Sequence, residues 1–193
     1  MVRDQALKQR AFPSGRAFWV AGTEWGKRPE NFSGYYNCTS THISDLEAFG
    51  LLVDLAMQGS GTGAVLEQDV IVNLPVVKNT LEIVSETPVG VKLKADRQEF
   101  TSYESLLPSG VVEIRVGDSR QGWRDAYQLL VNLAHVGLPR NECHIRIHLD
   151  LSTVRTCGER LKGFGGHTNP VKLGEAFRKV VDMLHGAQGR KLT

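Results

Sequence analysis

Apolar residues recur at three- and four-residue spacing in three parts of the chain, and this spacing predicts three amphipathic helices. Residues 44–47 match a capping box, in which a serine hydroxyl and a glutamate carboxylate satisfy the amides of the first helical turn. The second helix follows Ser119, and the third begins at Pro170 with Asn169 as its N-cap. Their apolar positions are Leu46, Phe49, Gly50, Val53, Ala56 and Met57; Trp123, Ala126, Tyr127, Leu130, Leu133 and Ala134; and Leu173, Ala176, Phe177, Val180 and Leu184.

Short β-branched runs separated by prolines and glycines predict a group of strands or hairpins around residues 64–116. These runs cover residues 70–72, 76–77, 89–93 and 111–116. A brief apolar run at 17–21 is interpreted as a short strand or extended segment.

Residues 145–151 alternate apolar and polar side chains, as does a strand with one face in a core. His148 and Asp150 fall on its polar face, where solvated surface residues are more common than catalytic ones. Helices interleaved with strands predict an α/β fold.

The composition is that of an ordinary globular chain of 193 residues with a net charge of +2. So small a charge does not indicate binding to nucleic acid or to an anionic membrane. The three cysteines, at positions 38, 143 and 157, form neither a disulfide framework nor a metal-binding CxxC pair. We find no signal peptide and no run of about 18 apolar residues, and we therefore expect a cytoplasmic protein without a membrane span.

Cys38 is the first candidate for chemistry, because it stands among hydrogen-bonding residues just ahead of a predicted helix start. Hydroxyl, amide and helix-dipole partners would favour the thiolate, which is the reactive form of cysteine. From local context alone, however, a free cysteine is more often a small buried core residue. Both interpretations stay open at this point.

Two glycine-rich segments have the composition of turns that bring backbone amides close to a phosphate. Residues 162–166 precede the third helix and resemble an anion site, although a tight turn is the more common role of such a segment. Residues 59–63 either approach a ligand or end the first helix. The histidines lack the spacing of a zinc motif, and no GxSxG elbow is present.

An ordered set of segments resembles the first catalytic segments of ribonucleotide reductases, and most closely those of the adenosylcobalamin-dependent, monomeric, triphosphate-reducing class. The segments are Asn37-Cys38 with Ser40-Thr41, residues 59–63, residues 117–123, residues 150–155 with 161–166, and residues 189–193. The resemblance implies an α/β fold that is roughly the first half of a ten-stranded α/β barrel, with an additional β-hairpin segment around residues 64–116. It divides the chain into a polar leader at 1–16 and an incomplete barrel domain at 17–193.

The same resemblance implies roles for individual residues. Cys38 matches one of the two cysteines that reduce the substrate and become a disulfide, its partner lying in another segment. Gly22, Thr23 and Asn37 fall where the family lines its substrate pocket. In related enzymes, a deoxynucleotide effector is bound near the positions of Ser44 and Asp45.

Further family features have no match in these 193 residues. They are the loop that carries the radical cysteine, the C-terminal cysteine pair and the sequence that completes the adenosylcobalamin site. The resemblance therefore implies one part of a reductase that works with a complementary reductase chain, a ribonucleoside triphosphate and a thioredoxin-like reductant. A non-catalytic nucleotide-binding or regulatory remnant, and a degraded product that does not fold alone, are the alternatives.

If the chain is one part of a split or interrupted gene product, it should form no deoxynucleotide alone and should become active with a complementary chain. Size-exclusion chromatography and turnover assays, with and without the chain encoded beside it, test this expectation. Deoxynucleotide formation by the 193-residue chain alone would overturn it.

Overall fold

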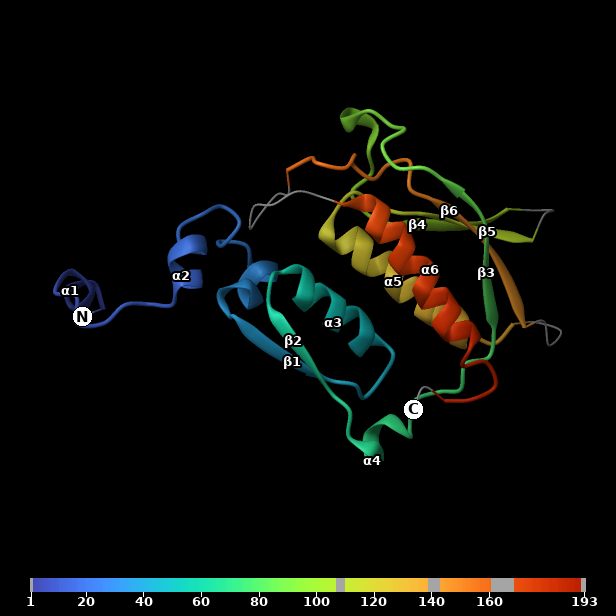
Figure 1. Ribbon diagram of the computed structural model, residues 1–193, viewed down its shortest axis with the longest axis horizontal. Helices are drawn as coiled ribbons and strands as arrows, with labels where there is room; N and C mark the ends of the chain where they lie inside the picture. Colours follow the sequence, from blue (N-terminus) through green and yellow to red (C-terminus); the bar gives the residue numbers. More distant parts are fainter. Residues whose placement is uncertain (1, 107–109, 139–142, 161–168, 192–193) are drawn as a thin grey trace.

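The computed structural model describes residues 2–106, 110–138, 143–160 and 169–191 (Figure 1). Two α-helices and a 3-10 helix precede the first strand: α1 (Val2–Leu7), α2 (Gly15–Val20) and η1 (Pro29–Tyr35). The next elements are β1 (Cys38–His42), α3 (Glu47–Met57), β2 (Gly61–Val65) and α4 (Gln68–Ile71). The remaining elements are β3 (Thr80–Thr87), η2 (Lys94–Asp96), β4 (Ser102–Leu106), β5 (Val111–Arg115), α5 (Arg120–His135), β6 (His144–Asp150) and α6 (Pro170–His185).

The described strands form two separate sheets. In the first, β1 and β2 pair in parallel and α3 connects them, so residues 38–65 make one strand-helix-strand unit. In the second, the order is β3-β6-β5-β4, with β6 parallel to both of its neighbours and β4 antiparallel to β5. The predicted α/β class is confirmed, and the described strands do not close into a barrel.

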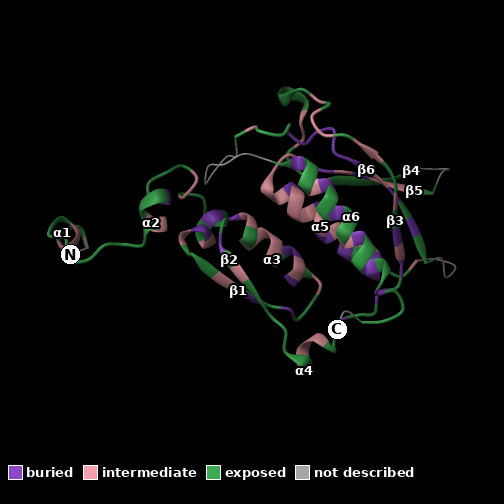
Figure 2. Ribbon diagram, in the orientation of Figure 1, coloured by how far each residue is buried: buried purple, intermediate pink, exposed green. Residues whose placement is uncertain are grey.

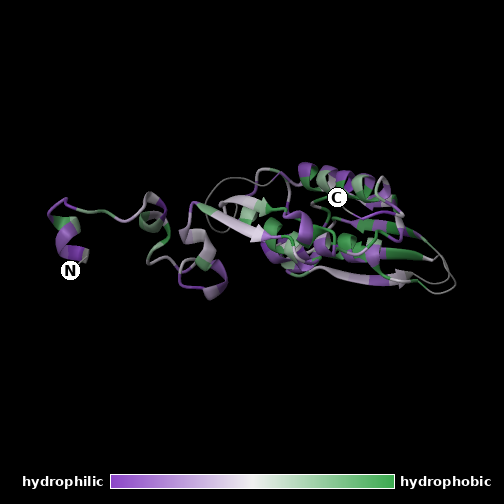
Figure 3. Cartoon of the chain, turned by 90° about the horizontal axis from the view of Figure 1, so that it is seen from below, coloured by the Kyte–Doolittle hydropathy of each residue, from purple (hydrophilic) through white to green (hydrophobic). Residues whose placement is uncertain are grey.

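Helices α5 and α6 cover one face of the four-stranded sheet, and together they form a two-layer unit (Figures 1 and 3). The main core lies between these layers, where the buried faces of both helices meet alternate residues of the strands. Its most deeply buried members include Val77, Ala134, Ile147 and Val154. By contrast, α1 and α2 are largely exposed and extend away from the sheets (Figure 2).

The second and third predicted helices are confirmed with their caps. The Ser119 hydroxyl accepts the Gly122 amide at 2.9 Å, and the Asn169 side chain accepts the Lys172 amide at 3.3 Å. The first predicted helix begins at Glu47, but its cap differs from the prediction. Asp45, not Ser44, accepts the Ala48 amide, at 2.9 Å.

Some predicted details of secondary structure are wrong. Residues 17–21 fall largely in α2, because the Ser14 hydroxyl caps that helix through the Ala17 amide. Residues 70–72 fall at the end of α4, and residues 89–93 contain a turn at 89–90 and no strand. Ala56 and Ala176 are exposed although their spacing predicted burial. β3 was not predicted, and its alternation is interrupted by a bulge between Ile83 and Ser85.

Polar side chains join α5 to α3, and so link the two units. The Gln128 amide donates to the Leu46 carbonyl at 3.0 Å and accepts the Gly50 amide at 2.9 Å. An α-helix normally pairs these two backbone groups with each other, so Gln128 inserts its side chain at the start of α3. Gly50 allows this approach, because a Cβ at that position would overlap the Gln128 oxygen.

Gly50→Ala should therefore destabilise the protein by about 1–3 kcal/mol, because it expels the Gln128 amide from buried hydrogen bonds. An exposed helical glycine would instead gain up to about 1 kcal/mol from alanine. Urea unfolding of Gly50→Ala and of Gly15→Ala, a helical glycine with open space around it, compares the two cases. Equal stability of the two variants would contradict the role given to Gly50.

Candidate active site

Cys38 is the first residue of β1, and its thiol is free and exposed. The interpretation of Cys38 as a buried core residue is therefore wrong. An exposed thiol can meet a substrate or a second thiol, as a disulfide-forming cysteine must.

Glycines lie beside Cys38 in the neighbouring strand. Cys38 is paired with Gly61, and Ser40, the next residue on the same face, is paired with Gly63. Around Gly63 the space that a side chain would fill is open, and the nearest atom to a Cβ on Gly61 would be the Asn37 carbonyl oxygen at 3.6 Å. The two-stranded sheet therefore presents a face next to the thiol that β2 leaves without side chains. We call these four positions, Cys38, Ser40, Gly61 and Gly63, the glycine-lined face.

The glycine segment 59–63 ends the first helix, as one of the two interpretations from the sequence expected, and its approach to a ligand stays a prediction. Gly59 has a φ of +76° and ends α3, a conformation that glycine adopts at little cost. Gly61 and Gly63 then line the strand beside the thiol. The two-residue spacing of Gly61 and Gly63 could have indicated this face from the sequence, since residues two apart in a strand point the same way.

Arg16 binds Asn37, which precedes Cys38 in the chain and is predicted to line the substrate pocket. Its Nε donates to the Asn37 side-chain oxygen at 3.0 Å, and its Nη2 donates to the Gly59 carbonyl at 2.7 Å. The Asn37 carbonyl in turn accepts the Gly61 amide at 2.8 Å. Arg16 was missed from the sequence because it lies within the segment interpreted as a leader.

The contribution expected from the helix dipole is wrong in direction. Because β1 and β2 are parallel, the chain returns along α3, and the carbonyl end of this helix lies at the Cys38 end of the sheet. That end carries partial negative charge, and the Arg16 guanidinium compensates it by binding the Gln58 and Gly59 carbonyls.

The other predicted site residues make their hydrogen bonds away from Cys38. Thr23 donates its hydroxyl to the Val20 carbonyl at 2.7 Å and accepts the Gly26 amide, so it shapes its own turn, with Gly22 at a φ of +79°. Ser44 and Asp45 follow the opposite end of β1, about 20 Å along an extended chain from Cys38. Their proposed roles in substrate and effector binding stay predictions.

A second polar cluster joins the loops that follow β5 and β6. Arg155 donates to the Asp118 carboxylate at 2.7 Å and to the Asp118 carbonyl at 2.9 Å. Arg97 binds Glu159 with two hydrogen bonds, at 2.9 and 2.7 Å, and approaches Asp118 at 3.6 Å. The predicted anion site at 162–166, farther along the chain, lies outside the described residues.

His148 and Asp150 are not the solvated residues that the strand pattern favoured. Asp150 is only 7% exposed, and it accepts Arg115 at 3.0 Å and the Ser152 amide at 2.8 Å. Burial acts to raise the pKa of Asp150, but the hydrogen bonds from Ser152 and Arg115 hold it below the ordinary value. His148 is half-buried and shares hydrogen bonds with the hydroxyls of Ser85 and Thr87, so β6 uses both residues to bind its neighbours.

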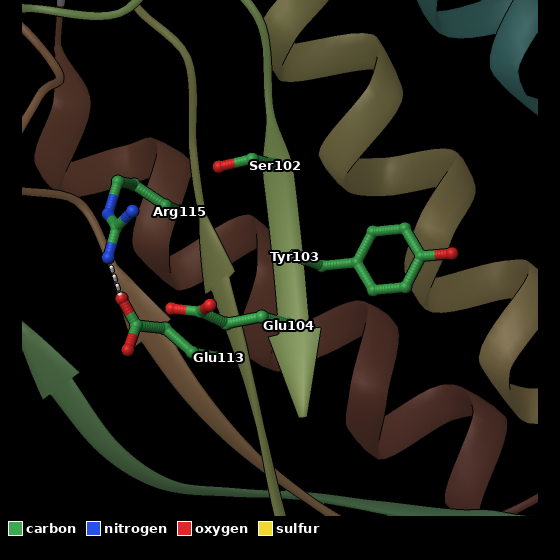
Figure 4. A pocket seen from close by; sticks show the side chains of 5 residues that line it. All are labelled: Ser102, Tyr103, Glu104, Glu113 and Arg115. Carbon is green, nitrogen blue, oxygen red and sulfur yellow. Dashed lines mark hydrogen bonds and ion pairs between the residues drawn. The ribbon is translucent and has the colours of Figure 1, made fainter. Parts of the chain in front are cut away.

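Two hollows lie on the four-stranded unit, and neither is lined by Cys38. Figure 4 shows the first, about 80 Å³, where Glu104 and Glu113 point the same way while Tyr103 points to the other side of β4. Ligand pockets usually enclose about 300–1,000 Å³, so this hollow is too small for a nucleotide. The second, about 550 Å³, lies between β3 and α6, and His144 Nε2 lies 3.0 Å from the Glu82 carboxylate at its edge.

Comparisons with known proteins agree with the resemblance found in the sequence. Residues 72–184 match the family described as "B12-dependent ribonucleotide reductase, insertion domain". The chain is 26% identical over 210 residues to the adenosylcobalamin-dependent ribonucleoside-triphosphate reductase of Lactobacillus acidophilus, and 28% identical over 212 residues to that of Lactobacillus helveticus. Both alignments cover 95% of this chain, which spans 28% of the length of each relative.

A crystal structure of a B12-dependent (class II) ribonucleotide reductase has a similar fold. The TM-score is 0.76 at 25% sequence identity, with 98% of this chain and 29% of that chain covered. The arrangement of both sheets is therefore one that a larger enzyme also contains.

The dependence of stability on pH tests the contribution of Glu159 to the second polar cluster. Hydrogen bonding to Arg97 lowers the pKa of Glu159 from 4.5 to about 2. Because the folded-state pKa is lowered, the ionised carboxylate stabilises the fold above pH 4.5, and this contribution is lost as the pH falls toward 2. Wild type should thus lose more stability than Glu159→Gln between these pH values in urea unfolding, and parallel pH profiles would exclude the contribution.

Proposed function

Since the chain belongs to the family of B12-dependent ribonucleotide reductases, we propose that it supplies a catalytic part of a ribonucleoside-triphosphate reductase, with Cys38 as a reducing thiol. The observation that carries the proposal is the exposed Cys38 on the glycine-lined face. A ribose brought to this face meets the thiol without a side chain from β2 in between.

The proposed reaction replaces the substrate 2′-hydroxyl with hydrogen. Cys38 and a second thiol from a complementary segment together give up two electrons and two protons, and a disulfide forms between them. The C2′–O bond breaks, the oxygen leaves as water, and C2′ gains a hydrogen. A thioredoxin-like dithiol then reduces the disulfide by thiol exchange.

Residues near Cys38 support binding in this proposal. Asn37 directs its side-chain oxygen to Arg16, which leaves its amide nitrogen to donate to a substrate hydroxyl. Gly22 and Thr23 are proposed to complete the substrate pocket, and Ser44 and Asp45 to contact a deoxynucleotide effector. The Asp45 carboxylate uses one oxygen to cap α3 and a second to accept the Ser44 hydroxyl, and each oxygen keeps capacity to accept a further hydrogen bond.

Adenosylcobalamin is proposed to bind the complete enzyme, because this chain spans only 28% of the length of its adenosylcobalamin-dependent relatives. Among the described residues, no group of three or more histidine, cysteine or acidic side chains is placed to hold a metal ion. No step by this chain's residues passes through the cofactor.

The proposed location is the cytoplasm. Within the part of the chain that the structure describes, no helix is long and apolar enough to cross a membrane.

Cys38→Ser should lower reductase turnover in the complemented enzyme by at least about a thousandfold, because a hydroxyl cannot form the disulfide. Nucleotide binding, measured by calorimetry, should be unchanged. Cys157→Ser, which removes another exposed thiol, should retain turnover. An unchanged rate in Cys38→Ser would instead support a non-catalytic nucleotide-binding remnant.

A further inference from the structure

Arg120 begins α5 and reaches across to two elements of the N-terminal half. Its Nε lies 3.2 Å from the Asp54 carboxylate on α3, and its Nη2 donates to the Glu30 carbonyl in η1 at 3.3 Å. The side chains of Arg120 and Asp54 are only 17% and 16% exposed. This ion pair therefore lies inside the contact between the two units.

The placement of Arg120 is energetically costly. Burial lowers the pKa of Arg120, while the Asp54 charge acts in the opposite direction. Arg120 Nη1 is also buried without a hydrogen-bond partner among the described residues. Desolvation offsets much of the attraction in such a pair, so the pair contributes little to stability by itself.

A series of hydrogen bonds leads from Asp54 to Asn37, the residue that precedes Cys38. The second Asp54 oxygen accepts the Gln58 side-chain amide at 2.9 Å, and Gln58 is buried at the end of α3. The Gln58 carbonyl accepts Arg16 at 3.4 Å, and Arg16 also binds the Asn37 side chain. Asn37 adjoins Cys38 and accepts the Gly61 amide across the sheet.

We propose that Arg120 is a positioning residue for Cys38: through Asp54, Gln58 and Arg16, it fixes the end of β1 from which the thiol projects. The matched segment 72–184, which includes α5, thereby controls the geometry of a thiol that precedes it in the chain. The role in reduction rests on the proposed function of Cys38, whereas the positioning itself is measurable without turnover.

Amide hydrogen exchange and amide chemical shifts of the ¹⁵N-labelled 193-residue chain test the proposal. The Gly61 amide reports the bond to Asn37, and the Ile147 amide, in the fully buried part of β6, reports global opening. Arg120→Ala and Asp54→Asn should each accelerate Gly61 exchange by about 2- to 30-fold, the range expected for coupling through a packed network. They should also shift the Cys38 amide resonance and leave Ile147 exchange unchanged.

Arg178→Ala is the control, because Arg178 lies on α6 and pairs with Glu86, away from the Arg120 network. It should leave Gly61 exchange unchanged, and Arg120→Lys should restore part of the protection by retaining the charge. The Arg120→Ala and Asp54→Asn effects should not add in the double variant.

Equal acceleration at Gly61 and Ile147 would indicate a merely structural role and would overturn the proposal, as would a Gly61 rate unaffected by Arg120→Ala and Asp54→Asn. If Arg120→Ala fails to fold, Asp54→Asn and Arg120→Lys carry the same comparison. The result is independent of the Cys38→Ser turnover assay, so either proposal can fail without the other.

Discussion

The crossing of α3 and α5 determines how the two sheets of this protein face each other. The sheets share no strand, and the helix contact relies on buried polar groups, with Gln128 at one end and Arg120 at the other. Buried polar groups require specific partners, and the loss of the Gln128 hydrogen bonds or of the Arg120–Asp54 ion pair leaves further buried polar atoms unsatisfied. The crossing therefore has one preferred register, set by two residues spaced eight positions apart on α5.

This register matters because Cys38 and the larger core lie in different units. Cys38 belongs to a small sheet of two five-residue strands, which contains little apolar core of its own. An isolated pair of strands is marginal in water, so the small unit needs support from its surroundings. The four-stranded unit contains the main core and provides a rigid support through α5.

The sequence predicted the α/β class and two of its longer helices accurately, because their signals are local. Ser119 and Asn169 each cap a helix within three residues, and the apolar spacing that follows is regular. The burial of Asp150 could not be predicted in this way, since its partner Arg115 lies 35 residues away and meets it only when β5 and β6 pair.

The same limit applies to Cys38. The order of the segments around Cys38 supported a family resemblance. Its exposure, however, depends on which residues of β2 lie beside it, and the direction of α3 follows only from the parallel pairing of β1 with β2.

The position of β6 in the sheet has a consequence for how the chain acquires its structure. Among the described strands, β6 comes last in sequence and is yet an inner strand, paired with β3 on one side and β5 on the other. The β4–β5 hairpin can form from residues that are close in sequence. β3, by contrast, cannot pair until β6 is present, because Thr80 pairs with His144. Closing so long a loop is entropically costly and slows folding. During synthesis, β3 therefore leaves the ribosome well before its pairing strand, and a chaperone that shields this stretch would act in that interval.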